Sequence, residues 1–174
     1  MNITLFILFR IIHIFAGVLW AGAAAAYFFF VEPAAKSSGP AGHKFIGNLT
    51  GKHRYPQFMG IVSLVTILSG VPLYLFDSGG LQLRWILSGT GMVYTIGSVI
   101  TVAVFILGIT QLSPRGARLA ALGREIENAG GPPSPAQLAE LEKIDGEMNV
   151  FEKWDLAMVG IALLTMATAR YWVF

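Results

Sequence analysis

Three stretches of this chain carry no charged side chain and are long enough to cross a lipid bilayer. The hydrocarbon core of a bilayer is about 30 Å thick, so a helix needs about 20 apolar residues to span it. Residues 11–31, 56–76 and 85–114 each meet that requirement. The first stretch ends at Glu32-Pro33, where the helix is expected to stop. Charged residues make up 13% of the whole chain, about half the fraction that is usual in soluble domains.

A fourth apolar stretch is shorter, because Asp155 and Arg170 enclose only residues 156–169. Along a helix these two charges lie about 22 Å apart. Each can reach its own interface, where Trp154 and Tyr171 supply aromatic anchors. We therefore predict one all-α domain, an integral membrane bundle of four transmembrane helices with spans at about residues 4–31, 56–76, 85–112 and 151–173.

The positive charges are distributed unevenly between the two ends of these spans. Most of them fall between the first and second spans or between the third and fourth: Lys36, Lys44, Lys52, Arg54, Arg115, Arg118, Arg124, Lys143 and Lys153. The opposite ends carry Arg10, Arg84 and Arg170. Since loops rich in lysine and arginine stay in the cytoplasm, we expect both of the longer loops inside the cell and both termini outside.

A cytoplasmic helical hairpin is predicted between the third and fourth spans, at about residues 114–150. Glycines and prolines at positions 130–133 interrupt the helical pattern. Ser134 and Gln137 then have the spacing of a capping box, with Pro135 in the first turn. Apolar residues recur at helical spacing on both arms, at Leu119, Leu122 and Ile126 and at Leu138, Leu141, Ile144, Met148 and Phe151. We expect these two apolar stripes to pack together.

The first span contains the chain's one histidine within an apolar run. His13 shares a helical face with Arg10, Gly17 and Trp20. Ionisable residues inside a membrane are expensive and are candidates for function, and neutral imidazole is a common ligand of haem iron. The small residues beside His13 would leave room for a flat cofactor or for a neighbouring helix. The alternative interpretation is that His13 only hydrogen-bonds a side chain or a carbonyl of another helix.

The depth of His13 decides which residues could serve as a second ligand. If the first helix begins near Ile3, His13 lies about 15 Å from its outer end, whereas a start at Ile11 would leave about 3 Å. If the helix begins near Ile3, the residues at a height comparable to that of His13 are Met92, Tyr94 and Met166. His43 and His53 belong to the cytoplasmic end. We therefore expect His–Met or five-coordinate ligation of a haem rather than ligation by two histidines.

No pattern in the sequence predicts a catalytic residue. The chain has no cysteine, which excludes disulfides and thiolate ligands, and it lacks the common nucleotide, zinc-protease and serine-nucleophile motifs. A net charge of +2 is too small to indicate nucleic acid as a partner. A basic cluster near the membrane surface fits contact with anionic lipids: His43, Lys44, Lys52, His53 and Arg54. Glu152 or Asp155 is expected to pair with His53 or Arg54 of this cluster.

The first span carries the pattern His13-x3-Gly17-x2-Trp20-x-Gly22. With this pattern the chain resembles small bacterial four-helix membrane proteins of unknown function, and more distantly the copper-resistance CopD and the HemJ membrane proteins. Further cues are Ser69-Gly70, the loop at residues 131–135, Met166-Ala167 and Ala169-Arg170-Tyr171. The resemblance to HemJ implies haem bound through His13, and the resemblance to CopD implies copper movement. Both imply the bacterial cytoplasmic membrane.

Three functions are compatible with these observations. The first is binding of haem b or a related tetrapyrrole through His13, with Arg10, Gly17, Trp20, Met166 and Met92 around it, in electron transfer or as an accessory subunit of a membrane redox complex. The second is a cofactor-free structural subunit of a larger membrane assembly. The third is transport of copper or a small solute along hydroxyl groups at Ser63, Thr66, Tyr94, Thr95 and Ser98. The expected partners are the lipid bilayer and other membrane subunits or a second copy.

Overall fold

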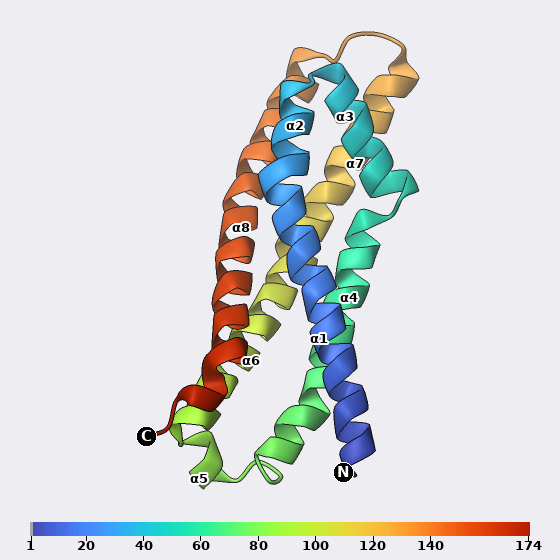
Figure 1. Ribbon diagram of the computed structural model, residues 1–174. Helices are drawn as coiled ribbons and strands as arrows, with labels where there is room; N and C mark the ends of the chain where they lie inside the picture. Colours follow the sequence, from blue (N-terminus) through green and yellow to red (C-terminus); the bar gives the residue numbers. More distant parts are fainter. Residues whose placement is uncertain (1) are drawn as a thin grey trace.

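Helices make up all the regular structure in residues 2–174, which the computed structural model describes apart from the side chains of Pro40 and His43. The first half of the chain contains α1 (Ile3–Ala26), the π-helical turn η1 (Tyr27–Val31), α2 (Glu32–Ser37), α3 (Pro40–Gly47), the π-helical turn η2 (Asn48–Lys52) and α4 (Tyr55–Asp77). The second half contains α5 (Leu83–Ile86), α6 (Gly89–Leu107), the π-helical turn η3 (Gly108–Leu112), α7 (Ser113–Ala129), α8 (Pro135–Thr168) and the 3-10 turn η4 (Ala169–Tyr171). These elements form an elongated bundle (Figure 1).

Three of the helical segments are long and apolar enough to cross a membrane: Ile3–Ser37, Tyr55–Asp77 and Gly89–Ala129. The length and apolar character of these segments confirm the expectation of a helical membrane protein. The segment α8 does not meet the same criterion, because Glu152, Lys153 and Asp155 interrupt its apolar part.

The first long helix does not stop at Glu32-Pro33, so that expectation from the sequence is wrong. A π-helical turn ends two residues before Pro33, and the helix continues to Ser37. Proline lacks an N–H, and its ring clashes with the carbonyl one turn earlier in a regular α-helix. The wider π-helical turn changes that spacing. The same arrangement recurs at η3, which ends two residues before Pro114 and lets α6 continue into α7.

The long helices associate mainly as two antiparallel pairs, α1 with α4 and α6 with α8 (Figure 1). A central layer joins the pairs through Trp20, Val62, Val104 and Val159, one residue from each helix. All four side chains of this layer are buried. Small residues allow the close approach within a pair, since a Cβ added to Gly97 would lie 2.5 Å from the hydroxyl of Thr165.

The end of the chain is fixed against the start of α6. The backbone N–H of Gly89 donates to the carbonyl of Phe174 at 3.2 Å. The side chain of Thr90 donates to the carbonyl of Trp172 at 3.2 Å. The helix α6 begins at Gly89 rather than at residue 85, because Ser88 caps it by accepting the N–H of Gly91. The C-terminal part of α8 therefore runs alongside α6 over the whole length of α6.

Helices occupy both arms of the predicted hairpin, and the segment between them lies at residues 130–134. Gly130 ends α7 with a φ of 67°, a conformation that glycine adopts without strain. The capping box is present, since the Ser134 hydroxyl accepts the N–H of Gln137 and the Gln137 side chain accepts the N–H of Ser134. Leu122 and Ile144 are the buried members of the two apolar stripes.

Candidate functional site

His13 joins the two helices of the first pair. Its Nδ1 lies 2.7 Å from the backbone carbonyl oxygen of Thr66 on α4. A carbonyl oxygen can only accept a hydrogen bond, so Nδ1 carries the proton and donates it. The imidazole also lies against Gly70, where an added Cβ would come within 2.9 Å of the ring. The glycine is therefore needed for this position of the ring.

This hydrogen bond leaves Nε2 of a neutral imidazole with a free lone pair. Metal-binding histidines commonly donate one ring N–H to a carbonyl, which fixes the tautomer and orients the other nitrogen toward the metal. The same bond also satisfies the histidine without any ligand. The contact with Thr66 thus prepares His13 to act as a ligand and makes it stable in the absence of one.

Met166 and His13 lie at matching positions on their helices, counted from the central layer. Seven residues are nearly two helical turns, so a side chain seven positions away points in almost the same direction, about 10 Å further along the axis. Moving seven residues outward from each member of the central layer gives His13, Ser69, Gly97 and Met166. Met166 packs close to Gly97, where an added Cβ would lie 3.2 Å from its terminal methyl group. His13 and Met166 are therefore the same number of residues from the central layer, on different helix pairs.

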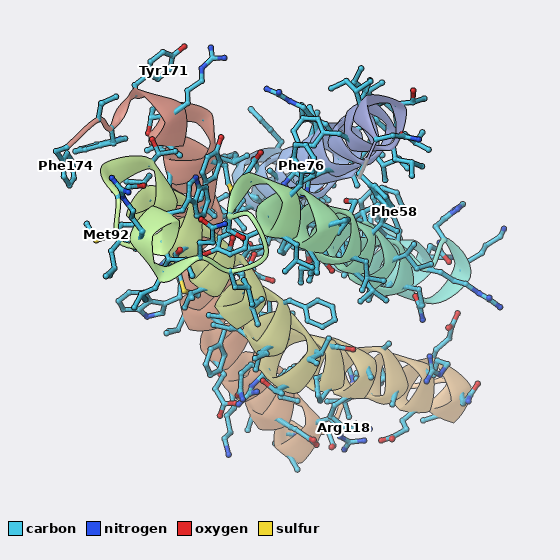
Figure 2. All side chains as sticks on the ribbon, turned by 90° about the horizontal axis from the view of Figure 1, so that it is seen from below. Phe58, Phe76, Met92, Arg118, Tyr171 and Phe174 are labelled. Carbon is cyan, nitrogen blue, oxygen red and sulfur yellow. The ribbon has the colours of Figure 1, made fainter. Side chains whose placement is uncertain are left out.

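The remaining predicted site residues lie elsewhere. Trp20 belongs to the central layer, two turns deeper than His13, and Gly17 faces the methyl group of Thr66. Arg10 is exposed and lies near Asp77 at the end of α4. Met92 is also exposed and lies on the side of the bundle that carries Phe174, away from Phe76 (Figure 2). These positions do not form a single pocket around the imidazole.

Three of the five hydroxyl groups that could line a solute path, those of Ser63, Thr66 and Thr95, donate to backbone carbonyls. Ser63 donates to Gly60 on its own helix, and Thr66 donates to Val62. Thr95 donates to the carbonyl of Gly91 at 2.7 Å. Its oxygen also lies 2.5 Å from the hydroxyl of Tyr74. These groups therefore satisfy the helices that carry them, which weakens the case for a polar transport path.

A partly buried group of charged residues lies at the opposite end of the bundle, and the sequence interpretation missed it. The carboxyl group of Glu32 on α2 bonds the ammonium group of Lys36 at 2.6 Å. The same ammonium group bonds Asp145 of α8 at 3.0 Å. Glu152, two turns further along α8, lies within hydrogen-bonding reach of Glu32. Among the described residues, neither His53 nor Arg54 pairs with Glu152 or Asp155 as expected. The side chain of His43 lies outside the described residues.

A signal for this group was present in the sequence. Glu32 and Lys36 are one turn apart directly after the first apolar run, and Asp145 and Glu152 are seven residues apart on one face of α8. The signal was not used, because a charge at the end of an apolar run was interpreted as marking the end of the helix. The helix continues instead and carries Glu32 to 8% exposure.

Two cavities lie at this same end of the bundle. One of about 460 Å³ is lined mostly by apolar residues of η1, α2 and α3, including Phe30, Ala34 and Phe45. The other, of about 290 Å³, is lined by Phe28, Phe29, Glu32, Pro33, Lys36 and Asn149. Neither cavity adjoins His13. No protein family, curated protein or solved structure matches this chain.

Proposed function

We propose that this protein is a four-span protein of the bacterial cytoplasmic membrane that binds haem b or a related tetrapyrrole through His13. In this role it would serve in electron transfer or as an accessory subunit of a membrane redox complex. The observation that carries the proposal is the hydrogen bond from Nδ1 of His13 to the carbonyl of Thr66, which leaves Nε2 free. A haem would supply one-electron chemistry, and His13 would hold it in place.

The position of Met166 supports the same proposal. It lies as many residues from the central layer as His13 does, on the other helix pair, and the proposal is that a haem reaches both side chains. Methionine is an established axial partner of histidine in electron-transfer haem proteins. Met92 is 37% exposed. Met166 is therefore the proposed second ligand.

The fourth span is part of the proposal, with α8 crossing the membrane beside α6. Two hydrogen bonds, to the carbonyls of Phe174 and Trp172, hold the end of the chain against the start of α6. Leu164 is 67% exposed on the outside of α8, as a lipid-facing residue would be. Trp154 and Tyr171, 62% and 66% exposed, lie about 26 Å apart along the helix, the spacing of two aromatic belts.

The absorption spectrum of the purified protein tests the proposal directly. We expect a Soret band in the protein as isolated or after addition of haem, and its loss in His13→Ala. Met166→Leu should keep the haem but convert a six-coordinate spectrum to a five-coordinate one. Met92→Leu is the matched control and should leave the spectrum unchanged. His53→Ala should also have no effect.

The absence of a Soret band under both conditions would refute haem binding. The structural-subunit alternative then becomes the better account, because the bond to Thr66 satisfies His13 without a cofactor. That alternative predicts a colourless protein that co-purifies with other membrane subunits. In it, His13→Ala costs only the interhelical hydrogen bond, about 0.6 kcal/mol and at most about 2.

A further inference from the structure

The oxygen atom Oε2 of Glu152 is enclosed by protein but has no hydrogen-bond donor among the described residues. Leaving a buried carboxylate oxygen without a donor is costly. The group that lies beside it is the carboxyl group of Glu32, which is 8% exposed. Two ionised carboxylates are both acceptors and cannot bond each other. A proton on one of the two would turn this contact into a hydrogen bond.

The surrounding charges do not remove the need for that proton. The cation that faces Glu152 is Lys36, and it is already shared between Glu32 at 2.6 Å and Asp145 at 3.0 Å. The other titratable groups that face this site are Tyr27 of η1, Tyr55 of α4 and Asp155 of α8, none of which is positive. The hydroxyl of Tyr55 donates to the carbonyl of Ala23 instead. One cation therefore serves three nearby carboxyl groups.

A route to the site is also present. The cavity of about 290 Å³ is lined by Glu32, Lys36 and Asn149, so it reaches the Glu32 side of the carboxyl pair. The described residues contain no group of three or more acidic or histidine side chains arranged to hold a metal ion. A proton is therefore the ligand that fits this pair best.

We propose that Glu32 and Glu152 form a proton-binding pair, in which one carboxyl group donates its proton to the other across the contact between α2 and α8. The bound proton comes from the water that reaches the cavity, and binding it changes the charge of the site by one unit. Two carboxyl groups that share a proton in this way are a known arrangement when like charges lie too close to ionise together. Loss of the proton leaves two negative charges in contact at a partly buried site and weakens the contact between α2 and α8. This inference does not depend on haem binding.

Infrared difference spectroscopy between neutral and alkaline pH tests the pair in the whole protein. We expect a carboxylic acid C=O band that disappears at alkaline pH and shifts in D2O, with the amplitude of one group per chain. Both Glu32→Gln and Glu152→Gln should abolish it, because the introduced amide donates a hydrogen bond and lets the remaining carboxyl group ionise. Glu142→Gln, at an exposed position of α8, is the matched control and should keep the band.

Thermal unfolding over the same pH range gives an independent measurement. The wild type should lose stability as the pH rises above neutral, and the two glutamine variants should not. Absence of the band in the wild type, or its persistence in both variants, would overturn the proposal. The proposal would also fail if Glu152→Gln were less stable than the wild type by the same amount at every pH. Such a result would mean that an ionised Glu152 stabilises the fold. The infrared band could be absent while Mg²⁺ raises the thermal stability of the wild type but not of Glu152→Gln. That result would overturn the proton-binding pair and assign the site to a cation instead.

Discussion

The contact between His13 and α4 depends on the absence of a side chain at position 70. The imidazole donates to the carbonyl of Thr66 and covers Gly70, so the hydrogen bond and the close packing occur at the same place. In a membrane there is no hydrophobic driving force between helices, and close packing and interhelical hydrogen bonds replace it. The pairing of α1 with α4 therefore depends on a polar contact, whether or not His13 also binds a cofactor.

Substituting Gly70 tests this dependence. In Gly70→Ala the new Cβ would meet the imidazole of His13 at 2.9 Å, so the ring must move and its bond to Thr66 is strained. We expect a loss of about 1–3 kcal/mol in the free energy of unfolding, as for other overpacked positions. Denaturant titration in detergent micelles measures it.

Gly60→Ala is the matched control on the same helix. A Cβ at this position meets nothing within 4 Å. Its stability should be unchanged or higher by up to about 1 kcal/mol, because alanine is the better helix former. Equal effects of the two substitutions would contradict the packing argument.

The residues of the two sites differed in how well the sequence revealed them. His13 stood out because it is ionisable within an apolar run, and depth arithmetic predicted Met166 at a comparable height. Met92 was expected at a height comparable to that of His13, but it lies on an exposed face of the bundle. The depth of a residue does not determine which way its side chain faces. Glu32 was missed because its burial depends on a π-helical turn, which is a tertiary outcome rather than a local signal.

Among the elements, the helices themselves were largely predictable but their connections were not. The apolar runs predicted the positions of α1, α4 and α6, and the capping box predicted the start of α8. Pro33 was expected to end the first helix, yet it lies within a continuous one, as Pro114 does in the third long segment. Both follow a π-helical turn, and the sequence rules describe regular α-helices in which proline is disruptive.

The capping box makes a prediction for the start of α8. In Ser134→Ala the N–H of Gln137 loses its acceptor, which lies at 3.3 Å in the wild type. We expect a cost of about 1 kcal/mol, seen as faster hydrogen exchange at residues 136–140 and no change in the part of α8 beside α6. Ser113→Ala is the control, because the exposed Ser113 makes no capping contact at the start of α7. Equal exchange in the two variants would contradict this role of Ser134.

The hairpin is also expected to respond to acid. Arg118 of α7 bonds both carboxylate oxygens of Glu140 on α8, at 2.7 and 3.0 Å, and this hydrogen bonding lowers the pKa of Glu140 below its usual value. A carboxyl group whose pKa is lower in the folded state stabilises the fold above the unfolded pKa and loses that contribution as the pH falls. The contact between α7 and α8 should therefore weaken below about pH 4, near the ordinary pKa of glutamate.

Hydrogen exchange of α7, corrected for the intrinsic effect of pH, measures this response. The effect should be small and should shrink further at high salt, because both partners are exposed. Arg118→Gln removes the cation and should make the acid response shallower. An identical pH profile in this variant would show that other groups are responsible.

At the scale of the whole molecule, the arrangement in two helix pairs puts apolar side chains on the outside of the bundle and leaves polar groups inside it. The outward faces of the pairs carry exposed apolar side chains, such as Ile61 on α4 and Val99 on α6. The inward faces carry His13 near one end and the pair of Glu32 and Glu152 near the other. The two differ in placement, because His13 bonds Thr66 within the pair of α1 and α4, whereas Glu32 and Glu152 come from different pairs. The proposed haem and the proposed proton use the same architecture at opposite ends.

The number of membrane crossings follows from where the chain ends. If α8 crosses the membrane, Phe174 lies on the side where α6 begins, and the loop at residues 130–134 lies on the other side. If α8 stays in the cytoplasm, Phe174 and this loop lie on the same side. The contact of Phe174 with Gly89 favours the first arrangement.

Because the chain has no cysteine, single introduced cysteines can report on which side of the membrane each position lies, without background labelling. In intact cells an impermeant maleimide should label Gln82→Cys and a cysteine added after Phe174, while Gly131→Cys and Ser38→Cys should react only after the membrane is opened. If the added C-terminal cysteine and Gly131→Cys were both protected from the maleimide in intact cells, the protein would have three spans. The end of α8 would then also have to separate from α6.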